Sequence, residues 1–234
     1  MVSEKDKLLN MLKEGKISEA EFKMLSIALN KKNSTISPLF SMLINPFQKI
    51  AGWSSLIAGA IVITCMSYLG VIAKVYFTGI LSILNSVVIK NPKIQLNFFL
   101  LLYQNMVCWL VMSSLFIMAA KISRKKGIRI VDFFGTVALA RFPYLIFTAF
   151  ISIIQIIDPA FMNIDISKGV QFHMSFTMIL FGFVMFFCVI WQVTTYFYAL
   201  KESSGLTEKH LWISFVTVLV LGEAISSMLT TIFF

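Results

Sequence analysis

The chain has 234 residues, of which 58% are hydrophobic and only 13% are charged, and its mean hydropathy is +0.85. A soluble domain carries about 25% charged residues, so this composition excludes a soluble domain and predicts an integral membrane protein. The net charge of +9 comes from short basic clusters that flank apolar runs. That pattern is typical of a membrane protein beside an anionic leaflet, and we expect no nucleic-acid partner.

Residues 1–36 are predicted to be a short helical hairpin followed by a polar linker. Ser18 and Glu21 have the S-x-x-E spacing of a capping box, and Ile17 and Phe22 occupy the two positions of a hydrophobic staple. Two short helices hide little apolar surface, so we expect the hairpin to present apolar residues to a partner. The expected contact residues are Ile17, Phe22, Leu25 and Leu29. The alternative is a solvated, charged tail that only precedes the membrane domain.

The string LLNMLKEGKISEAEFKML within this region resembles the short helical module called SHOCT, in which a Leu-rich helix is followed by Gly, Ile, Ser or Thr, and Glu-Phe. Modules of this type are thought to mediate oligomerisation or contact with a partner. The resemblance therefore implies a docking or self-association element.

Five apolar stretches in residues 37–234 are each long enough to cross a bilayer, which takes about 20 helical residues. They cover residues 53–73, 98–120, 133–157, 174–200 and 211–233. We therefore predict an all-α, polytopic bundle of five transmembrane helices. A further apolar stretch, residues 75–89, lies between Lys74 and Lys90 and is short for a span.

The distribution of Lys and Arg decides between five and six spans, because basic residues gather on the cytoplasmic side of a membrane protein. Five spans place 15 of the 20 basic residues on one side and 4 on the other, whereas a sixth span at 75–89 gives 11 against 8. We therefore expect a cytoplasmic N-terminus and an outside C-terminus, with residues 75–89 lying in the outer interface or extending the first span. One basic loop should face the anionic inner leaflet, and its residues are Lys121, Arg124, Lys125, Lys126 and Arg129.

Arg141 and Glu223 are the only charged residues well within the predicted spans, and a charge in the bilayer is costly enough to suggest a function. At 1.5 Å per residue they lie about 12 Å and about 18 Å from the cytoplasmic ends of their helices, so a direct ion pair is geometrically possible if those helices are neighbours. Alternatively, Arg141 snorkels toward the headgroups beside Asp132 or lines a substrate or proton pathway. Pro143 should kink the third span next to the Arg.

Two kinds of side chain within the spans predict close helix contacts. Amides can form interhelical hydrogen bonds, and small residues four apart let two backbones approach. The amides are Gln104, Asn105 and Gln192, and the small pairs are Ser55 with Gly59 and Gly222 with Ser226.

Common catalytic motifs are absent from the sequence, which has no HExxH, GxSxG or P-loop and no cluster of His or carboxylates. Cys65, Cys108 and Cys188 lie in apolar stretches without CxxC spacing. This arrangement indicates neither a disulfide framework nor a metal site. We therefore expect a protein that is not an enzyme and carries no cofactor.

Three stretches of the membrane portion carry a family resemblance. They are Asn45-Pro46-Phe47 before the first span, GTVALARFPYLI in the third, and WQVTTYFYALKESSGLTEKHLW from the fourth span into the fifth. On these stretches, residues 38–234 resemble the Yip-domain (Ypt-interacting protein) family, particularly its prokaryotic branch. The resemblance implies five spans with a cytoplasmic N-terminus. The DLYGP-type and GYSL-type motifs of eukaryotic members are missing, and the bias toward Ile, Phe and Lys suits a bacterial plasma membrane.

These features together predict a non-enzymatic membrane scaffold or adaptor, in which a helical bundle anchors a cytoplasmic hairpin that recruits partner proteins or further copies of the chain. The alternative is a small transporter or channel that uses Arg141 and Glu223 inside the bundle.

Overall fold

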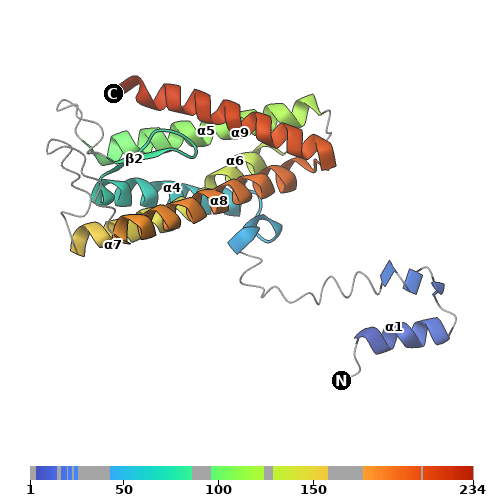
Figure 1. Ribbon diagram of the computed structural model, residues 1–234. Coiled ribbons are helices and arrows are strands. Elements are labelled where there is room, and N and C mark those ends of the chain that lie inside the picture. Colours follow the sequence, from blue (N-terminus) through green and yellow to red (C-terminus); the bar gives the residue numbers. More distant parts are fainter. Residues whose placement is uncertain are drawn as a thin grey trace. The chain divides into compact units, whose positions relative to one another are not determined.

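The computed structural model describes residues 4–14, 17–19, 21–22, 24–25, 43–85, 96–123, 129–157, 176–206 and 208–233 (Figure 1). The chain divides into two compact units, Met1–Leu43 and Ile44–Phe234. The predicted boundary between residues 36 and 37 falls in the stretch 26–42, which lies outside the described residues. Each unit is therefore considered by itself.

The N-terminal unit contains helix α1, Glu4–Lys13, and helical backbone at residues 19, 21, 22, 24 and 25. The predicted capping box is confirmed: Glu21 N donates to Ser18 Oγ at 3.3 Å, and Ser18 N donates to Glu21 Oε2 at 2.9 Å. These hydrogen bonds lower the pKa of the Glu21 carboxyl. The box is therefore complete at neutral pH and is lost only as the pH falls through that lowered pKa. Leu29, one of the four expected contact residues, lies outside the described residues.

The membrane unit begins with the 3-10 turn η1, Pro46–Gln48, and its helices are α4, Trp53–Ala73; α5, Phe98–Ile122; α6, Ile130–Leu139; α7, Phe142–Ile157; α8, Phe176–Ser204; and α9, Glu208–Thr230, followed by η3, Thr231–Phe233. Taken together as 130–157, α6 and α7 form one long apolar segment, so five segments of the described chain are long and apolar enough to span a membrane. The all-α fold with five spans is thus confirmed.

α4 and α6 lie at the centre of the packing of the spanning helices. In Figure 1, α9 lies alongside α5, while α7 lies alongside α8, and the contacts between elements agree with this arrangement. α4 packs mainly against α6 and α7, and α8 also contacts α6. α9 has its most extensive contacts with α5, and α7 and α9 are not among the helix pairs with extensive contacts.

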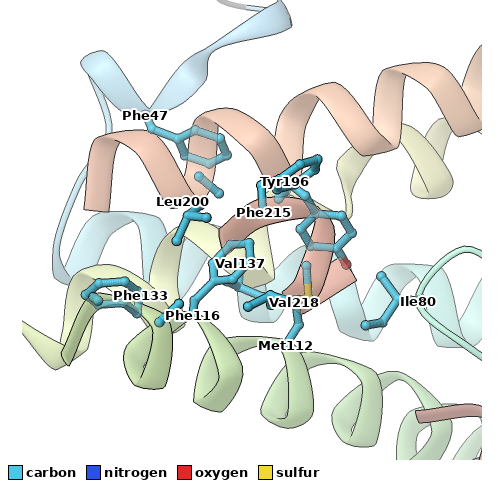
Figure 2. Close-up of a cluster of buried hydrophobic side chains, with 14 of the residues drawn as sticks. Phe47, Ile80, Met112, Phe116, Phe133, Val137, Tyr196, Leu200, Phe215 and Val218 are labelled. Carbon is cyan, nitrogen blue, oxygen red and sulfur yellow. The ribbon is translucent and has the colours of Figure 1, made fainter. Parts of the chain in front are cut away.

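A buried apolar cluster joins the helices at the centre of the membrane unit (Figure 2). Its members include Met112 and Phe116 of α5, Phe133 of α6, Leu200 of α8 and Phe215 of α9. Lipid tails are as apolar as these side chains, so the cluster stabilises the bundle through close packing and dispersion and gains little from the hydrophobic effect.

Helices α4 and α6 approach each other closely. A Cβ atom added at Gly59 would lie 2.7 Å from Leu139 N and 2.9 Å from Ala138 C. A Cβ atom added at Gly135 would overlap the hydroxyl of Ser55, whose side chain is fully buried. The prediction that Ser55 and Gly59 mark a close helix contact is confirmed, since only small residues admit this distance.

The prediction for residues 75–89 is wrong over the part that the structure describes. α4 ends at Ala73, Lys74 adopts a left-handed conformation (φ 52°), and the chain turns back into strands β1, Val75–Phe77, and β2, Ile83–Asn85. The two strands pair antiparallel in the register Val75↔Asn85 and Phe77↔Ile83. Residues 86–89 lie outside the described residues.

In this β1–β2 hairpin, residues 75–85, the residues from 75 to 80 are buried in the bundle, and those from 81 to 83 are half-buried. Val75, Phe77 and Ile80 are almost completely buried, and Phe77 contributes to a second apolar cluster with α4, α5 and α7. Non-helical backbone within a membrane protein requires partners for its N–H and C=O groups. The strands supply some of them, and polar side chains of the surrounding helices supply others.

A buried polar network around Arg141

The third span is broken at Ala140 and Arg141, and Pro143 is the second residue of the helix that follows. Pro143 has no N–H to donate back along the helix, and Tyr144 N donates to Arg141 O at 3.1 Å, so no backbone N–H is bonded to the carbonyl of Ala140. Gln192 Nε2 and Thr195 Oγ1 of α8 donate to this carbonyl at 2.9 and 3.0 Å. The predicted distortion at Pro143 is confirmed, and α8 satisfies a group that the break exposes.

The side chain of Arg141 is completely buried and binds neutral groups from two helices. Its Nη2 donates to Asn105 Oδ1 of α5 at 2.9 Å, and its Nη1 donates to the Tyr196 hydroxyl of α8 at 3.4 Å. Asn105 Nδ2 in turn donates to Ser67 Oγ of α4 at 3.0 Å. Arg141 thus ties together α4, α5 and α8 at the break of the third span.

Glu223 binds the hairpin and does not bind Arg141. Its carboxylate accepts from Leu81 N at 2.8 Å and from the Ser82 hydroxyl. The predicted ion pair with Arg141 does not form, because α9 packs beside α5 and the carboxylate is already occupied by the hairpin. Cys108 of α5 is fully buried, lies one helical turn beyond Asn105, and belongs to the same apolar cluster as Ile80 of the hairpin.

The snorkelling alternative for Arg141 is also wrong. The partner of Asp132 is Arg129, with Arg129 Nε 3.7 Å from Asp132 Oδ2, while the Arg141 side chain points into the bundle interior. Arg129 and Lys121 of the predicted basic loop are exposed. Arg124, Lys125 and Lys126 lie outside the described residues.

Two of the three intramembrane amides, Asn105 and Gln192, form the expected hydrogen bonds between spans, whereas Gln104 bonds to the hairpin. Asn105 and Gln192 bond as described above, and Gln104 Oε1 of α5 accepts from Phe77 N of the hairpin at 3.0 Å. Gly222 also lies at a close contact, since an added Cβ would lie 2.7 Å from Ile80 Cδ1, and Ser226 one turn further on is fully buried.

Sequence reasoning missed the hydroxyl-bearing partners in this network. Tyr196 binds Arg141, Tyr144 Oη donates to Leu81 O at 2.7 Å, and Thr230 Oγ1 donates to Thr78 O at 2.6 Å. The partners on α8 could have been recognised from the sequence. Thr195 and Tyr196 follow Gln192 by three and four residues, so the three polar side chains share one helix face.

Several polar atoms in the network keep unused hydrogen-bonding capacity. Within the described part of the chain, Arg141 Nε, Gln104 Nε2, Gln192 Oε1 and Ser113 Oγ are buried without a hydrogen-bond partner. Two of these, on Arg141 and Gln104, can only donate. The described residues contain no group of three or more His, Cys, Asp or Glu that could hold a metal ion.

The Asn45-Pro46-Phe47 stretch is anchored at the end of the bundle that carries Lys121, Arg129 and Lys201, here called the basic end. Asn45 Nδ2 donates to Glu202 Oε1 at the end of α8, at 2.9 Å, and Phe47 is buried in the central cluster. The segment before the first span is thereby fixed to the fourth.

Comparison with known proteins finds no match, either to a family model, to a curated protein or to a solved structure.

Proposed function

We propose that this chain is a membrane adaptor of the Yip-domain type, in which the five-span bundle anchors an N-terminal helical module that recruits partner proteins or further copies of the chain. The observation that carries the proposal is that residues 1–43 form a compact unit of their own with apolar side chains left exposed. Met24 is 70% exposed, and Leu9, Met11 and Leu25 are each at least 40% exposed. A soluble module gains stability by covering such side chains with a partner.

The closed interior of the bundle favours an adaptor over a transporter. Gln104, Asn105 and Arg141 are fully buried, and much of the polar network is used to bind the chain's own backbone and neighbouring helices. A transport pathway needs polar groups that face a water-filled space. The proposal includes no enzymatic activity and no cofactor.

The proposed setting is a bacterial plasma membrane, with the module in the cytoplasm and the basic end at the anionic inner leaflet. This orientation rests on the Lys and Arg distribution, with 15 basic residues on the proposed cytoplasmic side and 4 on the other.

Removal of the module tests the adaptor role. We expect the full chain in detergent to have at least twice the 26.5 kDa of one copy, by light scattering corrected for bound detergent. A variant with residues 1–36 replaced by a Gly/Ser segment of equal length should fall to one copy while keeping its helical circular dichroism. An unchanged protein mass would count against self-association through the module.

A transporter remains a second candidate because of one specific observation. Arg141 lies at a broken span, has no carboxylate partner, and has an unpartnered Nε among the described residues. Broken helices mark the binding sites of many transporters. Anion flux in proteoliposomes that is abolished in Arg141→Leu would favour this candidate over the adaptor.

A further inference from the structure

The β1–β2 hairpin fills the space between α5, α7 and α9 at the end of the bundle opposite the basic end. Its tip inserts Ile80 into the central cluster near Met112 and Val218 (Figure 2). The tip also approaches α9 so closely that a Cβ at Gly79 would overlap the Glu223 carboxylate. A side chain at that position would displace the carboxylate from the hairpin, so glycine allows the carboxylate to lie against the hairpin backbone.

Four side chains from the helices hold the hairpin through its backbone. Glu223 accepts from Leu81 N, Tyr144 donates to Leu81 O, Thr230 donates to Thr78 O, and Gln104 accepts from Phe77 N. Each hydrogen bond joins a hairpin backbone group to a side chain from a different position in the bundle. The hairpin can therefore leave as a unit without breaking any helix.

The hairpin has little stability of its own. Each strand has three residues, and an isolated two-stranded hairpin is marginally stable at best in water. Its connection to α4 is Lys74, the only residue other than glycine with a positive φ in the described chain, and such a conformation is strained for a side chain of this kind. The four side-chain contacts and the buried apolar residues are what keep the hairpin in place.

One unpartnered donor among the described residues lies beside the hairpin, and a second lies in the network around Arg141. Gln104 contacts the hairpin through Oε1, while its Nε2 has no acceptor among the described residues, and Arg141 Nε likewise has none. Water that entered after the hairpin moved would satisfy both donors. Opening on this side is therefore less costly than exposing an apolar interior.

We propose that the β1–β2 hairpin is a plug, latched by the Glu223 carboxylate, whose release admits water from the hairpin end of the bundle to the buried polar network around Arg141. The plug is independent of the adaptor role, since it concerns the end of the bundle opposite the basic end.

The Cys108 thiol can report whether water reaches the interior of the bundle. Cys108 is fully buried in the apolar cluster that Ile80 of the hairpin tip joins, and a thiol reacts with a maleimide only where water and the reagent reach it. With Cys65→Ser and Cys188→Ser as background, Cys108 is the only cysteine. A membrane-impermeant maleimide is added to sealed vesicles from one side at a time.

We expect the background protein to react slowly from either side. When the reagent is added at the hairpin end, Glu223→Ala should raise the labelling rate of Cys108 on the order of tenfold, because the loss of one strong hydrogen bond has an effect of that size. When it is added at the other end, the rate should not change. Tyr144→Phe, which removes the hydroxyl bonded to Leu81, should raise it in the same direction by less. Thr231→Val is the matched control, because the Thr231 hydroxyl donates to the backbone carbonyls of Ser227 and Met228 in the last turn of α9.

Equal labelling from both sides would mean general loosening of the bundle and would overturn the plug. Unchanged labelling in both Glu223→Ala and Tyr144→Phe would overturn it as well. If gel filtration shows that Glu223→Ala does not fold, the labelling rate of Cys108 in Tyr144→Phe is the test of the plug.

Discussion

Replacing Asn105 with leucine should lower the free energy of unfolding of the membrane bundle by about 2 to 4 kcal/mol. The substitution keeps the volume of the side chain but removes the oxygen that accepts from Arg141 Nη2 at 2.9 Å. The guanidinium would keep only the longer contact with Tyr196, at 3.4 Å, while remaining fully buried. Detergent titration followed by circular dichroism measures the change.

A double substitution separates the charge from the packing. In Arg141→Met the costly buried charge is gone, so adding Asn105→Leu to that variant should cost about 1 kcal/mol or less. Ser67→Ala is the control for the other hydrogen bond of Asn105 and should have a small effect. An Asn105→Leu cost that is the same with and without Arg141 would contradict this explanation.

Gly59→Ala is expected to destabilise the bundle by about 1 to 3 kcal/mol, in spite of the higher helix propensity of alanine. The new methyl group would lie 2.7 Å from Leu139 N and would overlap the side chain of Ala138, so α4 and α6 would have to separate. Backbone atoms cannot rotate away as the end of a flexible side chain can. The same detergent titration measures the loss.

Gly182→Ala is the matched control for this overpacking, because nothing lies within 4 Å of a Cβ added at Gly182 of α8. Without a contact to break, the variant should gain up to about 1 kcal/mol from helix propensity. A similar loss in both variants would mean that the effect comes from the helix and not from the α4–α6 contact.

Features that depend on local sequence or on average hydropathy were predictable. The five spans follow from their length and apolarity, because a bilayer imposes both. The Ser18–Glu21 capping box depends on residues three apart, and the break beside Pro143 on a missing N–H. The small pair of Ser55 and Gly59 is also recognisable, since close helix contacts in membranes require small residues.

Features that depend on which distant segments meet were not predictable. Arg141 and Glu223 have depths compatible with an ion pair, yet the packing of α9 against α5 gives each a different partner. The hairpin was missed because an apolar run of this length fits a short helix as well as two buried strands. The aromatic and β-branched residues Val75, Tyr76 and Phe77, followed by Gly79, were the available sign of a strand and a turn.

Photo-crosslinking from the N-terminal module in intact membranes tests the proposed adaptor role most directly. A benzophenone side chain at Met24, the position that is 70% exposed, should give a discrete protein adduct, either with a second copy or with a partner protein. The same group at Glu19, which is also exposed but lies five residues away on a different helix face, should give much less. Protein adducts concentrated at Met24 are the predicted result. Adducts with lipid alone, or none at either position, would contradict the proposal that this module recruits proteins.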